Sequence, residues 1–200
     1  MAHQAMPSTL LSFLLVSSSL VSLSSCDAED TISRKFACQF TFMTQNHAGN
    51  TLETALNGYG TYTFVSASYQ KGIWHIYSTP NDGKDKTEDI PITAANEKQY
   101  TNATNLGANN GIIMGHTNFG GMVAYDRQCP NCISQYAGTN YPLNWYESNR
   151  QMVTCAKCHR IYNLEYGSIE EGEKGERLMQ YMISYSTQAT GIGKVIWVHN

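Results

Sequence analysis

Charged side chains are scarce in this sequence. Asp, Glu, Lys and Arg make up 14% of the 200 residues, and the formal net charge is −3. The 13 Lys and Arg residues are spread along the chain and form no basic cluster. Because proteins neutralise nucleic acid phosphates with such clusters, we expect no nucleic acid partner.

Familiar catalytic motifs are also missing. The sequence has no H-E-x-x-H or H-x-x-x-H arrangement of histidines, no glycine-rich phosphate loop and no nucleophile elbow. It also lacks an internal repeat of solenoid period. A hydrolase is therefore not indicated, and we interpret the protein as non-catalytic, with an oxidoreductase or electron-transfer component left open.

The sequence has a single long apolar run, Leu10 to Leu23, near its N-terminus. The run is serine-rich and too short for a permanent membrane span, so residues 1–25 are predicted to be a signal peptide. It lacks the usual Lys or Arg flank, since residues 1–9 contain neither.

The run ends in Leu23-Ser24-Ser25-Cys26, which resembles the lipobox of bacterial lipoproteins. This resemblance implies that Cys26 carries the lipid and that residues 26–35 form an acidic, lipidated tether. The expected location is the bacterial cell envelope, with the protein anchored in a membrane through Cys26. An outer-membrane, periplasmic or surface-exposed position is equally compatible with the sequence.

The remaining residues, 36–200, have the composition of one all-β domain. Thirteen tyrosines and 16 glycines suit short strands joined by turns. In Phe36–Met43 the alternation of apolar residues predicts a strand with Cys38 in the core. Further predicted strands are Tyr62–Ser68 and Ile73–Ser78, which form a hairpin, then Gly111–Gly115, Met122–Tyr125, Leu178–Ser186 and Lys194–Val198, the last two joined around Gly191 and Gly193. Residues 80–110 are polar and are expected to form a surface loop.

Two C-x-x-C pairs are the most distinctive feature of the sequence. They are Cys129-Pro130-Asn131-Cys132 and Cys155-Ala156-Lys157-Cys158, with 22 residues between them. Each pair places two sulfurs on one side of a tight turn, and two facing turns supply four thiolates. Zn²⁺ is the favoured occupant and a single Fe the redox-active alternative. Disulfides Cys129–Cys132 and Cys155–Cys158, or bare thiols, stay open, because thiols oxidise outside the cytoplasm.

The surroundings of these pairs resemble the cluster-binding loops of Rieske-type iron–sulfur proteins. The resemblance lies in Tyr125-Asp126-Arg127-Gln128-Cys129-Pro130, in Val153 to Asn163 and Gly167, and in Leu178, Tyr181, Gly193 and Val195. Together with the lipobox and Asn110-Gly111-Ile112-Ile113, it is similar to Rieske-like lipoproteins of gut anaerobic bacteria. This implies a Rieske-like antiparallel β-sandwich with a small, rubredoxin-like metal subdomain at about residues 125–167.

The metal ligands depart from the family pattern, in which each loop supplies one cysteine and one histidine. Asn131 stands where the first histidine is expected, Cys158 takes the place of the second, and His159 is displaced by one residue. Cys132 and Cys158 thus replace imidazoles by thiolates. The resemblance therefore adds a [2Fe–2S] cluster on four thiolates as an alternative cofactor. The favoured expectation is a structural four-cysteine site in a binding or structural module, and the alternative is an iron–sulfur or rubredoxin-type electron carrier.

Overall fold

The computed structural model describes Met1, residues 31–187 and residues 194–200. The predicted signal peptide, the predicted lipidation site Cys26 and the predicted turn around Gly191 and Gly193 lie outside the described residues. The longest helix in the described part has seven residues, and none of its helices is long and apolar enough to cross a membrane.

A nine-stranded sheet dominates the fold, and its strands follow the order β4-β3-β2-β6-β7-β12-β13-β1-β5. All neighbouring strands are antiparallel. The strands are β1 (Cys38–Met43), β2 (Thr61–Gln70), β3 (Ile73–Pro80), β4 (Glu88–Pro91), β5 (Asn102–Leu106), β6 (Ile112–His116), β7 (Met122–Asp126), β12 (Gln180–Thr187) and β13 (Lys194–His199). Short helices α1 (Thr51–Asn57), α2 (Ala95–Tyr100) and the 3-10 helix η1 (Gly107–Asn109) connect them.

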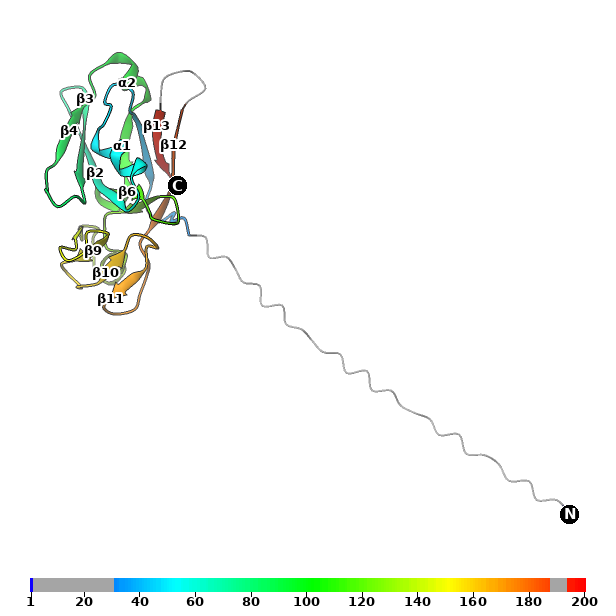
Figure 1. Ribbon diagram of the computed structural model, residues 1–200. Coiled ribbons are helices and arrows are strands. Elements are labelled where there is room, and N and C mark those ends of the chain that lie inside the picture. Colours follow the sequence, from blue (N-terminus) through cyan, green and yellow to red (C-terminus); the bar gives the residue numbers. More distant parts are fainter. Residues whose placement is uncertain (2–30, 188–193) are drawn as a thin grey trace.

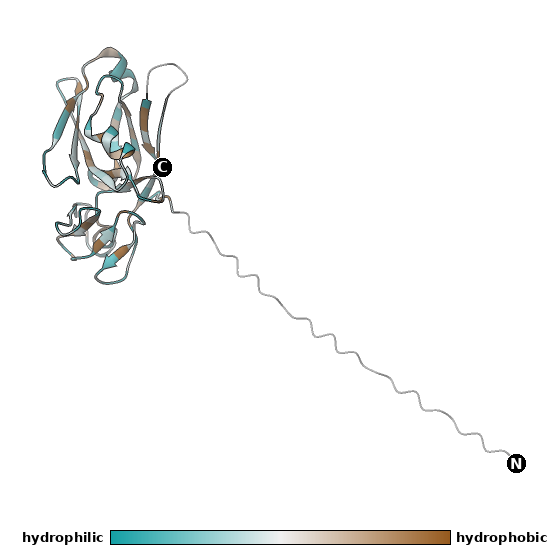
Figure 2. Ribbon diagram, in the orientation of Figure 1, coloured by the Kyte–Doolittle hydropathy of each residue, from teal (hydrophilic) through white to brown (hydrophobic). Residues whose placement is uncertain are grey.

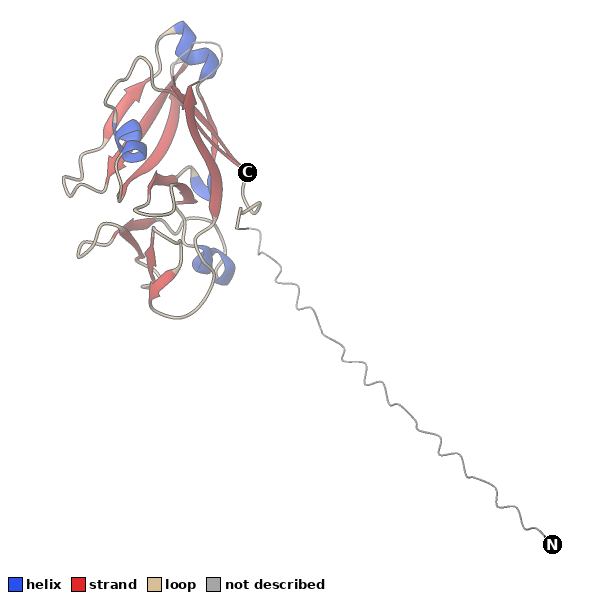
Figure 3. Ribbon diagram, turned by 45° about the vertical axis from the view of Figure 1, so that its right-hand side comes forward, coloured by secondary structure: helices blue, strands red, loops and turns tan. Residues whose placement is uncertain are grey.

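The large sheet curls at β12 into two layers. Gln180 and Tyr181 pair with β7, whereas Met182 to Thr187 pair with β13. Strands β4, β3, β2, β6 and β7 therefore form one layer and β12, β13, β1 and β5 form the other, as Figures 1 and 3 show.

The space between the two layers holds the first hydrophobic core. Alternate residues of the strands point into it, as the period of two requires. One layer contributes Val65, Ala67, Ile76, Ile112 and Met114, and the other contributes Cys38, Phe40, Phe42, Ile196 and Val198. Much of the brown that marks hydrophobic residues in Figure 2 therefore lies on the strands.

The opposite face of β2, β6 and β7 is also apolar and carries a second core. Its residues from these strands include Tyr62, Phe64, Ile113, Val123 and Tyr125. A small antiparallel sheet packs there, inserted in the chain between β7 and β12. It consists of β8 (Leu143–Trp145), β9 (Met152–Cys155), β10 (Ile161–Asn163) and β11 (Ile169–Glu171), preceded by helix α3 (Pro130–Gln135).

The all-β class predicted from the sequence is confirmed. The predicted hairpin is present as β2 and β3, closed by Lys71 (φ 50°) and Gly72 (φ 82°), the positive-φ pair of a type I′ turn. Cys38 is 3% exposed and lies in the first core, as predicted.

The expectation of a surface loop over residues 80–110 was wrong in part. This segment contains β4, α2 and β5, which form two edges of the large sheet and cover its end. Ile90, Ile92, Ala103 and Leu106 are buried. Strand β4 buries one side chain and β5 buries two, which is too few for a readable alternation among polar neighbours.

Candidate metal centre

The first C-x-x-C pair lies where the chain leaves β7 and begins α3. Cys129 is the N-cap residue of α3, Pro130 is its first residue, and Cys132 follows within the first turn. Proline suits this first position, because its missing N–H would have no partner inside the helix. The Cys129 backbone is held by its N–H donating to the carbonyl of Tyr141 (2.9 Å).

The second pair forms the turn between β9 and β10. Cys155 is the last residue of β9, and its N–H donates to the carbonyl of Arg160 at 3.0 Å. The N–H of His159 donates back to the carbonyl of Cys155 at 2.9 Å. His159 reverses the chain in the left-handed conformation (φ 59°), which non-glycine residues rarely adopt. Its exposed side chain lies outside the group of sulfur ligands.

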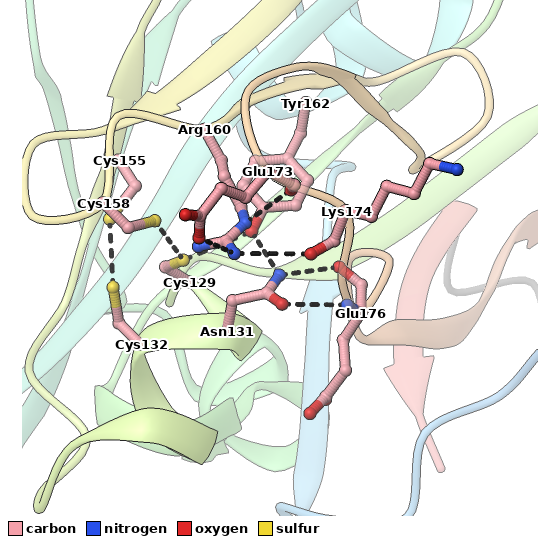
Figure 4. A network of polar contacts seen from close by, with 10 residues as sticks. All are labelled: Cys129, Asn131, Cys132, Cys155, Cys158, Arg160, Tyr162, Glu173, Lys174 and Glu176. Atoms are coloured by element: carbon pink, nitrogen blue, oxygen red, sulfur yellow. Dashed lines mark hydrogen bonds and ion pairs between the residues drawn. The ribbon is translucent and has the colours of Figure 1, made fainter.

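The two turns bring four sulfur atoms to one point (Figure 4). The Sγ atoms of Cys129 and Cys158 are 3.6 Å apart, and so are those of Cys132 and Cys155. All four sulfurs lie within 4.8 Å of one another. Four thiolates at 2.3 Å from a tetrahedral Zn²⁺ would be about 3.8 Å apart, so this arrangement could hold one metal ion.

The sulfur cluster is largely closed to solvent. Cys129, Cys132 and Cys155 are at most 1% exposed, whereas Cys158 is half-buried. All five cysteines of the described residues are free, and the two 3.6 Å contacts join one pair to the other rather than closing either pair on itself.

The pKa values of Cys129, Cys132 and Cys155 are shifted in different directions. Hydrogen bonding from Cys129, together with the backbone N–H groups of Cys158 and Lys157, lowers the pKa of Cys155 to about 4. The same contact with Cys155, with burial, raises the pKa of Cys129, and burial raises that of Cys132 to about 12. Neighbouring thiolates repel one another, so four thiolates at these distances require a cation among them.

Arg160 places a fixed positive charge beside the cluster. Its residue is 6% exposed, and hydrogen bonding to Cys158 raises the pKa of its guanidinium. The side chain donates to the carbonyl oxygen of Glu173 (2.8 Å), and forms an ion pair with the Glu173 carboxylate (3.1 Å). Arg160 therefore offsets negative charge on the sulfurs and ties the second turn to the loop after β11.

Tyr162 and Asn131 support the first turn from the other side. The Tyr162 hydroxyl lies 3.3 Å from Cys129 Sγ and accepts a hydrogen bond from Asn131 Nδ2 at 2.8 Å. With its lone pair engaged by Asn131, the hydroxyl is free to donate its proton to the sulfur. The Asn131 side chain also bonds the backbone N–H and carbonyl of Glu176 (2.9 and 2.8 Å). It thereby fastens the first turn to the same loop that Arg160 holds.

Asp126 fixes the junction at which the small sheet joins the large one. Its carboxylate is 0% exposed and accepts hydrogen bonds from the N–H groups of Ala108 and Gln128 and from the Tyr181 hydroxyl, each at 2.7 Å. Burial nevertheless raises its pKa. A Cβ added at Gly107 (φ 69°) would lie 2.2 Å from Asp126 Oδ2, so glycine permits this close approach. Asp126 thus links the exit from β7 to the return through β12.

The sequence identified the four cysteines but not the residues that support them. In the sequence Asn131 is only a departure from an expected histidine, and nothing there predicts a separate role for Arg160 or Tyr162. These three residues act through contacts with segments up to 45 positions away, and a single sequence contains no signal for such pairings.

Comparison of the chain with models of known protein families, with curated proteins and with solved structures finds no match. The resemblance to Rieske-type proteins therefore stays a prediction from the sequence. What the structure contributes is the geometry: a curled antiparallel β-fold with four cysteines placed to hold a metal ion.

Proposed function

We propose that this protein is a Rieske-like lipoprotein of the bacterial cell envelope in which four cysteines bind one structural zinc ion. The lipid on Cys26 anchors it to a membrane, and the domain serves there as a non-catalytic binding or structural module. The observation that carries the proposal is the approach of all four sulfurs to within 4.8 Å of one another inside the second core.

A structural role for the metal is supported by the size of the elements around it. Strands β8 to β11 have only three or four residues each, and the four cysteines are part of the apolar cluster that joins them to the large sheet. Segments this small rarely fold on apolar burial alone, and a metal that links their turns supplies the missing free energy.

Electron transfer by a single iron is the second candidate, and one observation favours it. Cys158 is half-buried, and the neighbouring Ala156, Lys157 and His159 are exposed, so one edge of the metal site would lie close to solvent. Four thiolates hold one Fe in the same tetrahedral geometry as Zn²⁺. A [2Fe–2S] cluster fits less well, because its two thiolate pairs bind different irons and must lie further apart than ligands of one ion.

Metal analysis of protein purified without oxygen separates these candidates. We expect colourless protein with one zinc per chain and no free thiol at the four positions until a chelator is added. Iron with strong visible absorption would establish the electron carrier instead. Absence of both metals, with only the Cys38 thiol reactive after unfolding, would indicate disulfides among the four cysteines, such as Cys129–Cys132 and Cys155–Cys158, and would contradict the zinc proposal.

The lipid anchor is tested separately by Cys26→Ala. Without the acceptor sulfur the protein should move from the membrane fraction to the soluble fraction. Ser25→Ala is the matched control, because a small residue before the cysteine is retained, and this variant should stay in the membrane fraction. Membrane association of the Cys26→Ala protein would contradict the anchor and leave the zinc site unaffected.

A further inference from the structure

The outward face of the β12-β13-β1-β5 layer carries no charged residue at its paired positions. The strand register forms two rows across this face, which we call the uncharged face: Met182, His199, Gln39 and Asn105, and Ser184, Trp197, Thr41 and Asn102. The intervening residues of the same strands, such as Phe40 and Val198, point into the first core. None of these eight residues is Asp, Glu, Lys or Arg, although the chain contains 29 of them (13 + 16).

Two large apolar side chains stand exposed on the uncharged face. Trp197 is 44% exposed and Met182 is 42% exposed. The His199 ring stacks on Trp197 with its centroid at 3.9 Å, and His199 is the cross-strand partner of Met182. The three side chains therefore form one continuous amphipathic strip on an otherwise polar sheet surface.

The N-terminal segment of the domain is fastened at the edge of this strip. The N–H of Ser33 donates to the carbonyl of Gln180 (2.7 Å), and Asn200 Nδ2 donates to the carbonyls of Ser33 and Phe36 (2.8 and 2.7 Å). An open groove of about 600 Å³ lies here, lined by Ile32, Arg34, Ala37, Met182 and Asn200. Met182 belongs to both the groove and the uncharged face. Figure 1 shows the chain entering the domain close to its C-terminus.

We propose that the uncharged face and this groove dock on the lipid surface of the membrane that holds the anchor. This inference rests on the proposed lipid at Cys26. The five peptide links from Cys26 to Thr31 span at most about 18 Å, so the face is held at high effective concentration against the bilayer. A short tether of this kind makes even a small apolar strip sufficient for binding.

The chemistry of the face suits the zone of lipid headgroups. Tryptophan is enriched at this depth of a membrane, because its ring is apolar and its N–H is polar. Hydroxyl and amide side chains satisfy headgroup oxygens, and the lack of carboxylates avoids repulsion from anionic lipids. Strand β11 and the loop after it form a contrasting surface, with exposed Glu170, Glu171, Glu173 and Glu176.

The test uses the full lipidated chain in vesicles of phosphatidylcholine and phosphatidylglycerol whose acyl chains carry bromine, which quenches tryptophan emission on contact. The chain has three tryptophans. We expect quenching in the native protein and its loss in Trp197→Phe. Trp74→Phe is the matched control and should keep the quenching, because Trp74 packs against the first core.

The outcomes separate this inference from the anchor on which it rests. Protein that fails to float with the vesicles would disprove the anchor and the docking together. Protein that floats without quenching, or whose quenching persists in Trp197→Phe, would disprove the docking alone. Floating protein with an unquenched Trp197 and crosslinks between two copies would assign the uncharged face to self-association instead.

Discussion

The two cores of this protein lie on opposite faces of the same three strands, yet they are closed in different ways. On one face of β2, β6 and β7, the curled sheet returns over itself and encloses hydrocarbon side chains. On the other face, four cysteines occupy the cluster, and strands of three or four residues cover it. Apolar burial can stabilise the first arrangement alone, whereas the second depends on what the sulfurs bind.

This difference explains why the supporting residues gather on one side. Arg160 and Asn131 join the cysteine turns to the loop after β11, and Tyr162 links Asn131 to Cys129. The first core has long strands with many ladder hydrogen bonds, such as the eight paired positions of β2 and β3. A region with short strands has few backbone hydrogen bonds between strands, so it needs side-chain hydrogen bonds and a metal to hold it together.

Removing the metal should have the largest effect, and this effect should fall on the second core alone. Chelation should expose the amides of residues 127–178 to hydrogen exchange and leave β2, β6 and β13 protected. Structural zinc sites in small peptides contribute about 10–16 kcal/mol of binding free energy, so a loss of several kcal/mol is expected for the small sheet. Equal hydrogen exchange in both regions would show that the first core also depends on the metal for its stability.

Cys155→Ser provides the same test without a chelator, because it removes one of the four ligands. Cys38→Ala is the matched control, since Cys38 is a buried cysteine of the first core. The control should retain one metal per chain and a protected small sheet, whereas Cys155→Ser should lose both. Full metal content in Cys155→Ser would contradict the four-sulfur site.

Asp126→Ala tests the link between the regions. Two backbone N–H groups and the Tyr181 hydroxyl would lose their acceptor inside the protein, at a cost of about 3 kcal/mol or more. Denaturant unfolding measures this loss, and Asp126→Asn should recover part of it because the amide oxygen still accepts. An unchanged midpoint in Asp126→Ala would show that the junction is not held by this carboxylate.

Tyr162→Phe should have a smaller effect, confined to the metal side. The hydroxyl bond to Cys129 is lost, but Asn131 keeps its bonds to Glu176. We expect the protein to lose about 1 kcal/mol of stability. Its metal affinity should fall roughly tenfold, as measured by competition with a chelator. Unchanged affinity would mean that the hydroxyl positions nothing at the sulfur.

Glu173→Gln should have the smallest effect. The Glu173 side chain is 87% exposed, so its ion pair with Arg160 contributes only about 0–1 kcal/mol. The backbone carbonyls of Glu173 and Lys174 continue to hold the guanidinium. Arg160→Ala, in contrast, removes the charge beside Cys158 and should weaken metal binding. Thermal unfolding should show a larger loss of stability in Arg160→Ala than in Glu173→Gln. A larger loss in Glu173→Gln would contradict these roles.

Sequence periodicity predicted the strands whose side chains alternate clearly. Phe40 and Phe42 in β1, the Lys71-Gly72 turn and the hydrophobic run of β6 are local signals, and each leads to the structure found. Strand β5 was missed because only Ala103 and Leu106 point inward among Asn and Thr residues, and its pairing with β1 contains an irregularity.

The approach of the cysteine pairs was likewise predictable, because the two turns have a known ligand spacing. The second core was not, since the sequence does not reveal that Tyr62, Phe64 and Ile113 face away from the first core toward a distant insertion. The Trp145 ring stacks on Phe64 with centroids 3.8 Å apart, although 81 positions separate them in the chain (145 − 64). Such contacts follow from the tertiary fold and leave no local pattern.

X-ray absorption at the metal edge of the purified, intact protein tests the central claim most directly. One ion with four sulfur neighbours at about 2.3 Å and no second metal nearby is the result expected for the four converging cysteines. A short metal–metal distance would indicate a two-iron cluster. Nitrogen or oxygen neighbours in place of any sulfur, or no bound metal at all, would contradict the account.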